Sequence, residues 1–127
     1  MHSDPIADMA TRMRNAHQAG HTSVSFPHSK VKELVLTVLK SKRYISNYSV
    51  QKDGKFESIT VTFDESRNGF NITRISKPGQ RIYKAHDELK QVRNGFGISV
   101  VSTSQGVMAG FEAFRKGIGG EVMLEVY

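Results

Sequence analysis

Apolar residues recur at helical spacing in two segments of the chain's first half. The first segment predicts a helix that is capped by Asp4, starts at Pro5 and ends near Gly20. The second segment predicts a helix over residues 29–41, with the Ser29 hydroxyl at its amino end. The residues expected to face the core are Ile6, Met9, Ala10 and Met13 in the first helix and Val31, Leu34, Val35, Val38 and Leu39 in the second.

Alternation of apolar and polar residues predicts a β-hairpin after the second helix. Its arms cover residues 44–51 and 56–63, and Asp53-Gly54 supplies the tight turn between them. Ile59, Val61 and Phe63 should point to the core, and the hydroxyl residues between them should face water. A shorter strand over residues 24–26 precedes the second helix.

Short strands dominate the pattern of the second half. A β region begins at Phe70, a turn follows at Pro78-Gly79, and a strand covers residues 98–101. Short helices are expected over residues 87–93 and 112–116. The last strand is expected to point Val122, Leu124 and Val126 inward.

Length limits the number of domains, and charge indicates the type of partner. The 127 residues fit one compact unit or two very small subdomains that share a core, and the polar segment 65–69 is the expected boundary. Eighteen Lys and Arg against twelve Asp and Glu give a net charge of +6, spread over both halves. Distributed positive charge favours a polyanionic partner, with ordinary solubility charge as the alternative.

Several classes of chemistry lack the residues they need. The chain has no Cys, so it has neither disulfides nor thiolate sites. The segment after Met1 does not resemble a signal peptide, and no apolar run is long enough to cross a bilayer, so we expect no membrane partner. His17 and His21 have no third zinc ligand, and Gly95-Phe96-Gly97 precedes a strand where a dinucleotide site needs a helix. We therefore expect no metal and no cofactor.

A row of small hydrogen-bonding groups, Ser102-Thr103-Ser104, follows the strand over residues 98–101. Hydroxyls both donate and accept, and at the end of a strand they can meet the sugars, phosphates and base edges of RNA. Gly106 and Gly119-Gly120 would allow close backbone approach, and Glu121 could accept hydrogen bonds from base amines. The alternatives are a polar turn closed by its own hydrogen bonds, or a small hydrolase that pairs Ser102 or Ser104 with His86.

Residues 74–84 contain four cations and no acid. The cations would bind phosphates, and Tyr83 could stack on a base or pack in the core. Alternatively, this cationic segment could belong to a protein-docking module that binds an acidic protein partner. The candidate residues of this segment are Lys77, Pro78, Gly79, Arg81 and Tyr83. At the amino end of the second helix, Lys30 and Lys32 oppose the helix dipole, which an external anion would explain.

These residues carry a resemblance to the bacterial type of small-subunit ribosomal protein S eight, which extends from Asp4 to the last residue. The matching motifs are Asp4-Pro5-Ile6-Ala7-Asp8-Met9, Thr11-Arg12-Met13-Arg14-Asn15-Ala16, Ser29-Lys30, Ser76-Lys77-Pro78-Gly79, Arg81-Ile82-Tyr83, Gly95-Phe96-Gly97-Ile98, Val100-Val101-Ser102-Thr103-Ser104 and Gly119-Gly120-Glu121.

The resemblance implies an α+β fold of two small, tightly associated α/β domains. Residues 1–66 would form an N-terminal α-β-α-β-β domain, and residues 67–127 a mostly β, RNA-binding domain with short helices. It also implies a non-enzymatic constituent of the small ribosomal subunit, in the cytoplasm or in an organellar ribosome, next to other ribosomal proteins.

The implied ligand is an irregular stem in the central domain of small-subunit ribosomal RNA, bound early in assembly, and in some bacteria a similar stem in the protein's own messenger RNA. Ser102, Thr103, Ser104 and Glu121 would make the most discriminating contacts. The residues implied to grip the RNA backbone are Thr11, Arg12, Arg14, Asn15, Ser29 and Lys30.

Two departures from the family pattern affect local structure. Ala109-Gly110-Phe111 stands where the family usually has Thr-Asp and then a polar or basic residue, so a helix cap is expected to be missing. His28 stands where a small residue is more usual, directly before Ser29.

Overall fold

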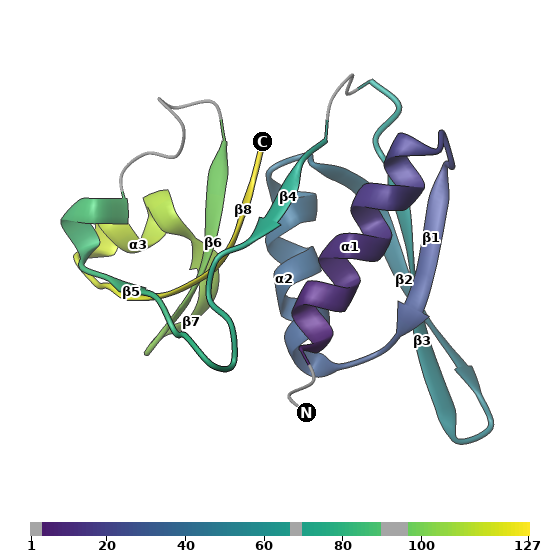
Figure 1. Cartoon of the computed structure of the whole chain (residues 1–127), viewed down its shortest axis with the longest axis horizontal. Coiled ribbons are helices and arrows are strands. Elements are labelled where there is room, and N and C mark those ends of the chain that lie inside the picture. Colours follow the sequence, from purple (N-terminus) through teal and green to yellow (C-terminus); the bar gives the residue numbers. More distant parts are fainter. Residues whose placement is uncertain (1–3, 67–69, 90–96) are drawn as a thin grey trace.

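The computed structural model describes residues 4–66, 70–89 and 97–127 and confirms the predicted α+β class (Figure 1). The first half has the order α-β-α-β-β, and the second half is mostly strands with short helical segments. In chain order the elements are α1 (Pro5–Gln18), β1 (Ser23–Pro27), α2 (Lys30–Ser41), β2 (Ile45–Asp53), β3 (Phe56–Phe63), β4 (Ile72–Arg74), β5 (Tyr83–Lys84), the 3-10 helix η1 (His86–Leu89), β6 (Ile98–Thr103), β7 (Gly106–Ala109), α3 (Gly110–Lys116) and β8 (Gly120–Val126).

These elements stack in four layers, visible from left to right in Figure 1. α3 covers a five-stranded antiparallel sheet of order β4-β8-β6-β7, in which β5 also pairs with β8. α1 and α2 form the next layer, and a three-stranded antiparallel sheet of order β1-β3-β2 forms the last. α1 contacts β1 and β4, and α2 contacts β2 and β7, so both helices lie between the two sheets.

The first two helices start where the sequence predicts. Asp4 Oδ1 accepts a hydrogen bond from the Ala7 amide at 3.1 Å, and Ser29 Oγ accepts one from the Lys32 amide at 3.3 Å. Each bond satisfies one of the amide donors that a helix leaves unpaired at its amino end. α1 is followed by Gly20 at φ 80°, a left-handed conformation in which glycine carries no Cβ penalty.

The buried face of α2 is rotated relative to the prediction. Val31 and Leu34 are exposed, whereas Leu36 is fully buried and Lys32 is only 4% exposed. The Lys32 ammonium donates to the Pro27 carbonyl at 2.8 Å, and burial lowers the pKa of Lys32. The apolar pattern of the sequence did not reveal this rotation, because the observed face includes a lysine. Lys32 is therefore an inward-facing cation and not one that meets an external anion.

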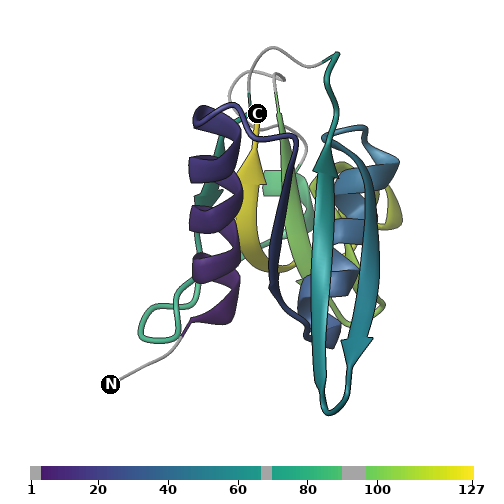
Figure 2. The same ribbon diagram turned by 90° about the vertical axis from the view of Figure 1, so that its right-hand side faces the viewer.

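The β2–β3 hairpin agrees with the prediction, including the turn at Asp53-Gly54 and the inward side chains of Ile59, Val61 and Phe63. The opposite face of this sheet is not covered by a helix (Figure 2). From the strand register, that face presents Ser23, Ser25, Pro27, Asn47, Ser49, Gln51, Asp53, Phe56, Ser58, Thr60 and Thr62. Asp53, at the hairpin end, is the only charged residue among them, so this face carries none of the chain's positive charge.

The last strand does not alternate as predicted. Met123 is buried together with its neighbours Val122 and Leu124, and the pairing with β6 contains an irregularity opposite this residue. Met123 and Leu124 pack in the main core, whereas Val122 belongs to a smaller cluster with Ala113 of α3. Because layers cover both faces of the five-stranded sheet, this strand does not need a polar side.

The short helices differ slightly from the prediction. α3 starts two residues earlier than expected, and its N-cap residue Ala109 makes no side-chain cap, as the departure from the family pattern implied. Of the helix expected over residues 87–93, residues 87–89 form part of η1, and residues 90–93 lie outside the described residues.

Two arginines join the halves of the chain. Arg74 Nε donates to Asp4 Oδ2 at 3.1 Å, and its Nη1 donates to the Met123 carbonyl at 2.7 Å. Arg14 Nη1 donates to the Ile72 carbonyl at 2.9 Å. The main apolar core also contains residues of both halves. The boundary at residues 66/67 stays a prediction, because residues 67–69 lie outside the described part.

Replacing Arg74 by Met should lower the free energy of unfolding by about 2–3 kcal/mol, because Asp4 loses a charge-assisted hydrogen bond at a mostly buried site. Urea titration followed by circular dichroism measures the change. Arg12→Met is the matched control, since Arg12 pairs with Asp8 on the exposed surface of one helix and should cost no more than about 0.5 kcal/mol. Equal, small losses in both variants would show that Arg74 does not hold the halves together.

Candidate nucleic-acid interface

Three predicted site residues form one row across the five-stranded sheet. Ser102 of β6 lies opposite Glu121 of β8, and Tyr83 of β5 lies opposite the same Glu121. Directly opposed residues of antiparallel strands project from one face, with Cβ atoms roughly 5 Å apart. Tyr83 is 70% exposed, so the alternative of a core tyrosine is wrong. The row thus places a ring, a carboxylate and a hydroxyl side by side.

The hydroxyl residues divide between a strand and a turn. β6 continues two residues further than predicted, through Ser102 and Thr103, so that only Ser104 and Gln105 form the turn. Thr103 Oγ1 donates to the Gly106 carbonyl at 2.8 Å and accepts from the Gln105 amide at 3.1 Å, which closes the turn. Within the described residues, the hydroxyls of Ser102 and Ser104 make no such bond, and they can therefore serve a ligand.

Glu121 is held in place by Arg81. Arg81 Nη1 lies 3.1 Å from Glu121 Oε2 and 3.5 Å from Oε1. The Glu121 side chain is mostly buried, whereas that of Arg81 is half exposed. A guanidinium has five N–H donors, so this pair leaves donors for a ligand while it fixes the carboxylate next to the Ser102 hydroxyl.

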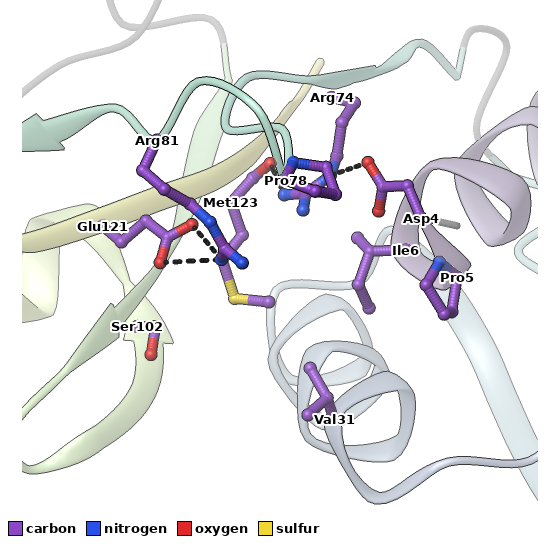
Figure 3. A pocket seen from close by; sticks show the side chains of 10 residues that line it. All are labelled: Asp4, Pro5, Ile6, Val31, Arg74, Pro78, Arg81, Ser102, Glu121 and Met123. Carbon is purple, nitrogen blue, oxygen red and sulfur yellow. Dashed lines mark hydrogen bonds and ion pairs between the residues drawn. The ribbon is translucent and has the colours of Figure 1, made fainter. Parts of the chain in front are cut away.

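A groove of about 370 Å³ lies between the halves, beside this row. Its lining residues are Asp4, Pro5, Ile6, Val31, Arg74, Pro78, Arg81, Ser102, Glu121 and Met123. Figure 3 shows Arg81, Glu121 and Ser102 on one side and Ile6 and Val31 of the helices on the other. The groove therefore has one polar and one apolar wall. The sequence assigned Ile6 and Val31 to the core, because no local pattern reveals a groove that forms only where the two halves meet.

The glycines near the row serve two different purposes. A Cβ on Gly119 would lie 2.5 Å from the Lys84 carbonyl, and one on Gly120 would collide with the Ser102 carbonyl, so β8 can pass between β5 and β6 only with glycines. Gly106 instead adopts φ 114°, and a Cβ there would meet open space. Backbone of neighbouring strands thus lies close to Gly119-Gly120, whereas Gly106 faces open space, and the role of all three glycines toward RNA stays a prediction.

The cations of residues 74–84 point in different directions. Arg74 is engaged between the halves, whereas Lys77 and Arg81 are exposed and Lys84 is partly exposed. The turn at Pro78-Gly79 is confirmed by two backbone hydrogen bonds of 2.9 Å between Lys77 and Gln80. Three of the four cations are thus accessible to a polyanion.

The candidates of the first half also separate into accessible and engaged side chains. The exposed ones are Thr11, Arg12, Asn15 and Lys30. Ser29 caps α2, and Arg14 is partly buried through its bond to the Ile72 carbonyl. The Arg14 guanidinium therefore connects α1 to β4, and its role toward RNA stays a prediction.

Two histidines of the first half, His17 and His28, have structural contacts. The His17 ring packs 5.3 Å from the Phe63 ring and 5.5 Å from the Phe70 ring, so it is a packing residue. His28 lies within 2.9 Å of Glu33 and 3.4 Å of Glu57 and leaves the Ser29 cap intact. Among the described residues, no group of three or more His, Asp or Glu could hold a metal ion. No helix of residues 4–66, 70–89 and 97–127 is long and apolar enough to span a membrane.

Comparison with known proteins agrees with the resemblance. The model of the family described as Ribosomal protein S8 matches residues 4–127. The chain belongs to the ribosomal protein S8 family. A member of this family is a structural constituent of the small ribosomal subunit and not an enzyme, so the hydrolase alternative with His86 falls away.

Bacterial relatives match the chain over nearly its whole length. Small ribosomal subunit protein uS8 of Hydrogenovibrio crunogenus is 48% identical over 124 residues, which cover 95% of each chain. The proteins of the same name from Nocardioides and Kosmotoga olearia are both 44% identical, over 98% and 100% of each chain. The alignments with the Nocardioides and Kosmotoga proteins span 132 and 134 positions, more than the 127 residues of this chain, so they include short gaps.

Gly120→Ala should destabilise the protein by about 1–3 kcal/mol, because the added methyl group collides with the Ser102 backbone and must push β8 away from β6. Thermal unfolding measures the loss. Gly79→Ala is the control, since a Cβ there meets nothing within 4 Å and the backbone is not left-handed. A neutral result for Gly120→Ala would mean that β6 and β8 can separate without cost, and that the row is not rigid.

Proposed function

We propose that this protein binds an irregular stem in the central domain of small-subunit ribosomal RNA directly and early, and thereby supports subunit assembly. The observation that carries the proposal is the row of Tyr83, Glu121 and Ser102 beside an accessible groove. Family membership supports the coarser part of this function, namely a place in the small subunit with ribosomal RNA and ribosomal proteins as partners.

The two kinds of contact have separate tasks in this proposal. Lys30, Lys77 and Arg81 neutralise phosphates around the groove, which supplies affinity that is sensitive to salt and insensitive to sequence. Ser102, Ser104 and Glu121 would bind base edges and ribose hydroxyls of non-paired nucleotides. Small neutral donors and a fixed carboxylate discriminate between bases, because an unmatched polar group loses its partner in the complex.

Ser104→Ala should weaken binding of the cognate stem by about 1–3 kcal/mol, roughly 5- to 150-fold, the cost of an unmatched polar group at an interface. The Ser102→Ala variant should show a loss of the same order. Filter binding with a short stem-loop transcript measures both. Ser23→Ala is the matched control, because this exposed hydroxyl lies on the outer face of the other sheet, which carries no cation. Unchanged affinity in both site variants would disprove the role of the hydroxyls.

Two lysines of α2 offer a matched test of the phosphate contacts. Lys30 is exposed and Lys32 is buried, although only two residues separate them. Lys30→Gln should weaken binding to any duplex RNA and reduce the slope of log K against log salt by about 0.9. Lys32→Met should leave that slope unchanged. If Lys30→Gln and the unsubstituted protein had the same salt slope, Lys30 would not contact RNA phosphates.

A messenger RNA with a similar stem would compete for the same surface, and this competition is how the protein would repress translation of its own operon. A protein-docking module would behave differently, because polyglutamate would displace its ligand. Under the proposed function, the ribosomal stem displaces a labelled stem and polyglutamate does not.

A further inference from the structure

A fully buried serine lies at the start of the segment that connects β4 to β5. Ser76 is 0% exposed. Its Oγ accepts a hydrogen bond from the Ile82 amide at 2.7 Å and donates one to the Ile82 carbonyl at 3.3 Å. One hydroxyl thus meets both backbone polar groups of a residue further along the chain. Because a buried polar group without a partner costs free energy, these bonds fix Ile82 relative to Ser76.

Backbone hydrogen bonds attach both ends of this segment to the same residue of β8. The Ser76 amide donates to the Val122 carbonyl at 3.1 Å, and the Val122 amide donates to the Ile82 carbonyl at 2.9 Å. Val122 is itself 1% exposed and packs with Ala113 of α3 in the smaller apolar cluster. Ser76, Ile82 and Val122 therefore form one connected set of hydrogen bonds, which we call the Ser76 anchor.

The loop over residues 77–81 is held between the two ends of the Ser76 anchor. The turn within this loop is closed by the bonds between Lys77 and Gln80. Pro78 and Arg81 of the loop line the groove, and Figure 3 shows both side chains there. A short loop whose two ends are fixed has few conformations left to it, so the Ser76 anchor decides where these two side chains lie.

The Ser76 anchor also brings an ion pair together. Arg81 precedes Ile82 and Glu121 precedes Val122, so the hydrogen bond between Ile82 and Val122 places the two charged residues side by side. Arg81 Nη1 lies 3.1 Å from Glu121 Oε2. A displacement of Ile82 would move Arg81 with it, because adjacent residues share a rigid peptide group.

Two acids line the groove, and each is paired with an arginine. Asp4 lies 3.1 Å from Arg74, and Glu121 lies at the same distance from Arg81. The charges of these four groove residues are therefore balanced. The Glu121 side chain is only 16% exposed, so without Arg81 it would be a mostly buried carboxylate that lacks its partner and repels RNA phosphates.

We propose that Ser76 is a positioning residue for RNA recognition, which acts through Arg81 on Glu121 and determines the selectivity of the groove. The proposal rests on the proposed function of the groove. Ser76 is buried and does not itself touch the RNA. It keeps the Glu121 carboxylate compensated and fixed, so that this carboxylate accepts hydrogen bonds from the donors of a non-paired nucleotide. A serine that only stabilised the fold would change stability without changing selectivity.

Ser76→Ala tests the proposal with two RNAs, the cognate stem-loop and a regular duplex of the same length. The affinity for the stem-loop should fall on the order of tenfold, because Glu121 is no longer held in place. The affinity for the duplex should fall at most about twofold, because a regular duplex meets the exposed cations and inserts no nucleotide into the groove. Filter binding measures both, at a temperature where circular dichroism shows the variant to be folded.

Ser99→Ala is the matched control for this substitution. Ser99 is also buried, in β6 of the same sheet, but it lies next to Gly110 of α3 and not at the loop. The Ser99→Ala variant should keep the selectivity for the stem-loop. Unchanged selectivity in a folded Ser76→Ala variant would overturn the proposal.

A double substitution shows whether Ser76 acts through the carboxylate. Adding Ser76→Ala to Glu121→Gln should weaken stem-loop binding by no more than about twofold beyond Glu121→Gln alone, because the group that the serine positions is already gone. Additive losses of the two substitutions would show that Ser76 acts elsewhere, and the proposal would be wrong.

Arg81→Met is the second test and serves if Ser76→Ala does not fold, because the Arg81 side chain is half exposed. It should lower the ratio of stem-loop to duplex affinity by about tenfold. Lys77→Met, which removes an exposed cation of the same loop, should weaken both RNAs equally. An equal loss for both RNAs with Arg81→Met would also overturn the proposal. Failure of the unsubstituted protein to prefer the stem-loop over the duplex would instead refute the function proposed for the groove.

Discussion

The structure depends on one apolar core that two sheets share. α1 and α2 lie between these sheets, so each helix must bury side chains in two directions, and the main core contains residues from both ends of the chain. The halves are consequently fixed to each other by packing, and Arg74 adds a polar link from Asp4 to the Met123 carbonyl. The groove beside Glu121 exists only because this arrangement is fixed.

A consequence of the shared core is that positive charge serves two purposes. Arg14, Arg74 and Lys32 point inward and satisfy backbone carbonyls of neighbouring segments. Lys77 and Arg81 are accessible beside the groove. The outer face of the three-stranded sheet has a row of uncharged hydroxyls and amides. A net charge of +6 therefore does not describe a uniformly basic surface, and the position of each cation decides whether it can meet a phosphate.

The sequence predicted those parts of the fold that local chemistry determines. Asp4 and Ser29 were sufficient to place two helix starts, and the alternation of Ile59, Val61 and Phe63 placed the hairpin face. The prediction from the sequence failed where the packing of neighbouring layers decides which side chains are buried. Met123 interrupts the simple period because it packs in the main core with segments distant in the chain, whereas Lys32 turns inward to donate to the carbonyl of Pro27 just before its own helix. The sequence predicted which residue types belong to the row at Glu121. Their arrangement side by side follows from the register of β5, β8 and β6, which the sequence does not show.

The hydroxyl residues show why register decides chemistry at this site. Ser102, Thr103 and Ser104 are equivalent as a sequence motif, but the structure gives their hydroxyls different surroundings. The Thr103 hydroxyl closes the turn with the Gly106 carbonyl, whereas Ser102 takes the position opposite Glu121. One hydroxyl therefore makes the turn rigid so that its neighbours can present theirs in a fixed direction. Fixed donors lose little entropy on binding, so under the proposed function this short polar turn would discriminate effectively between bases.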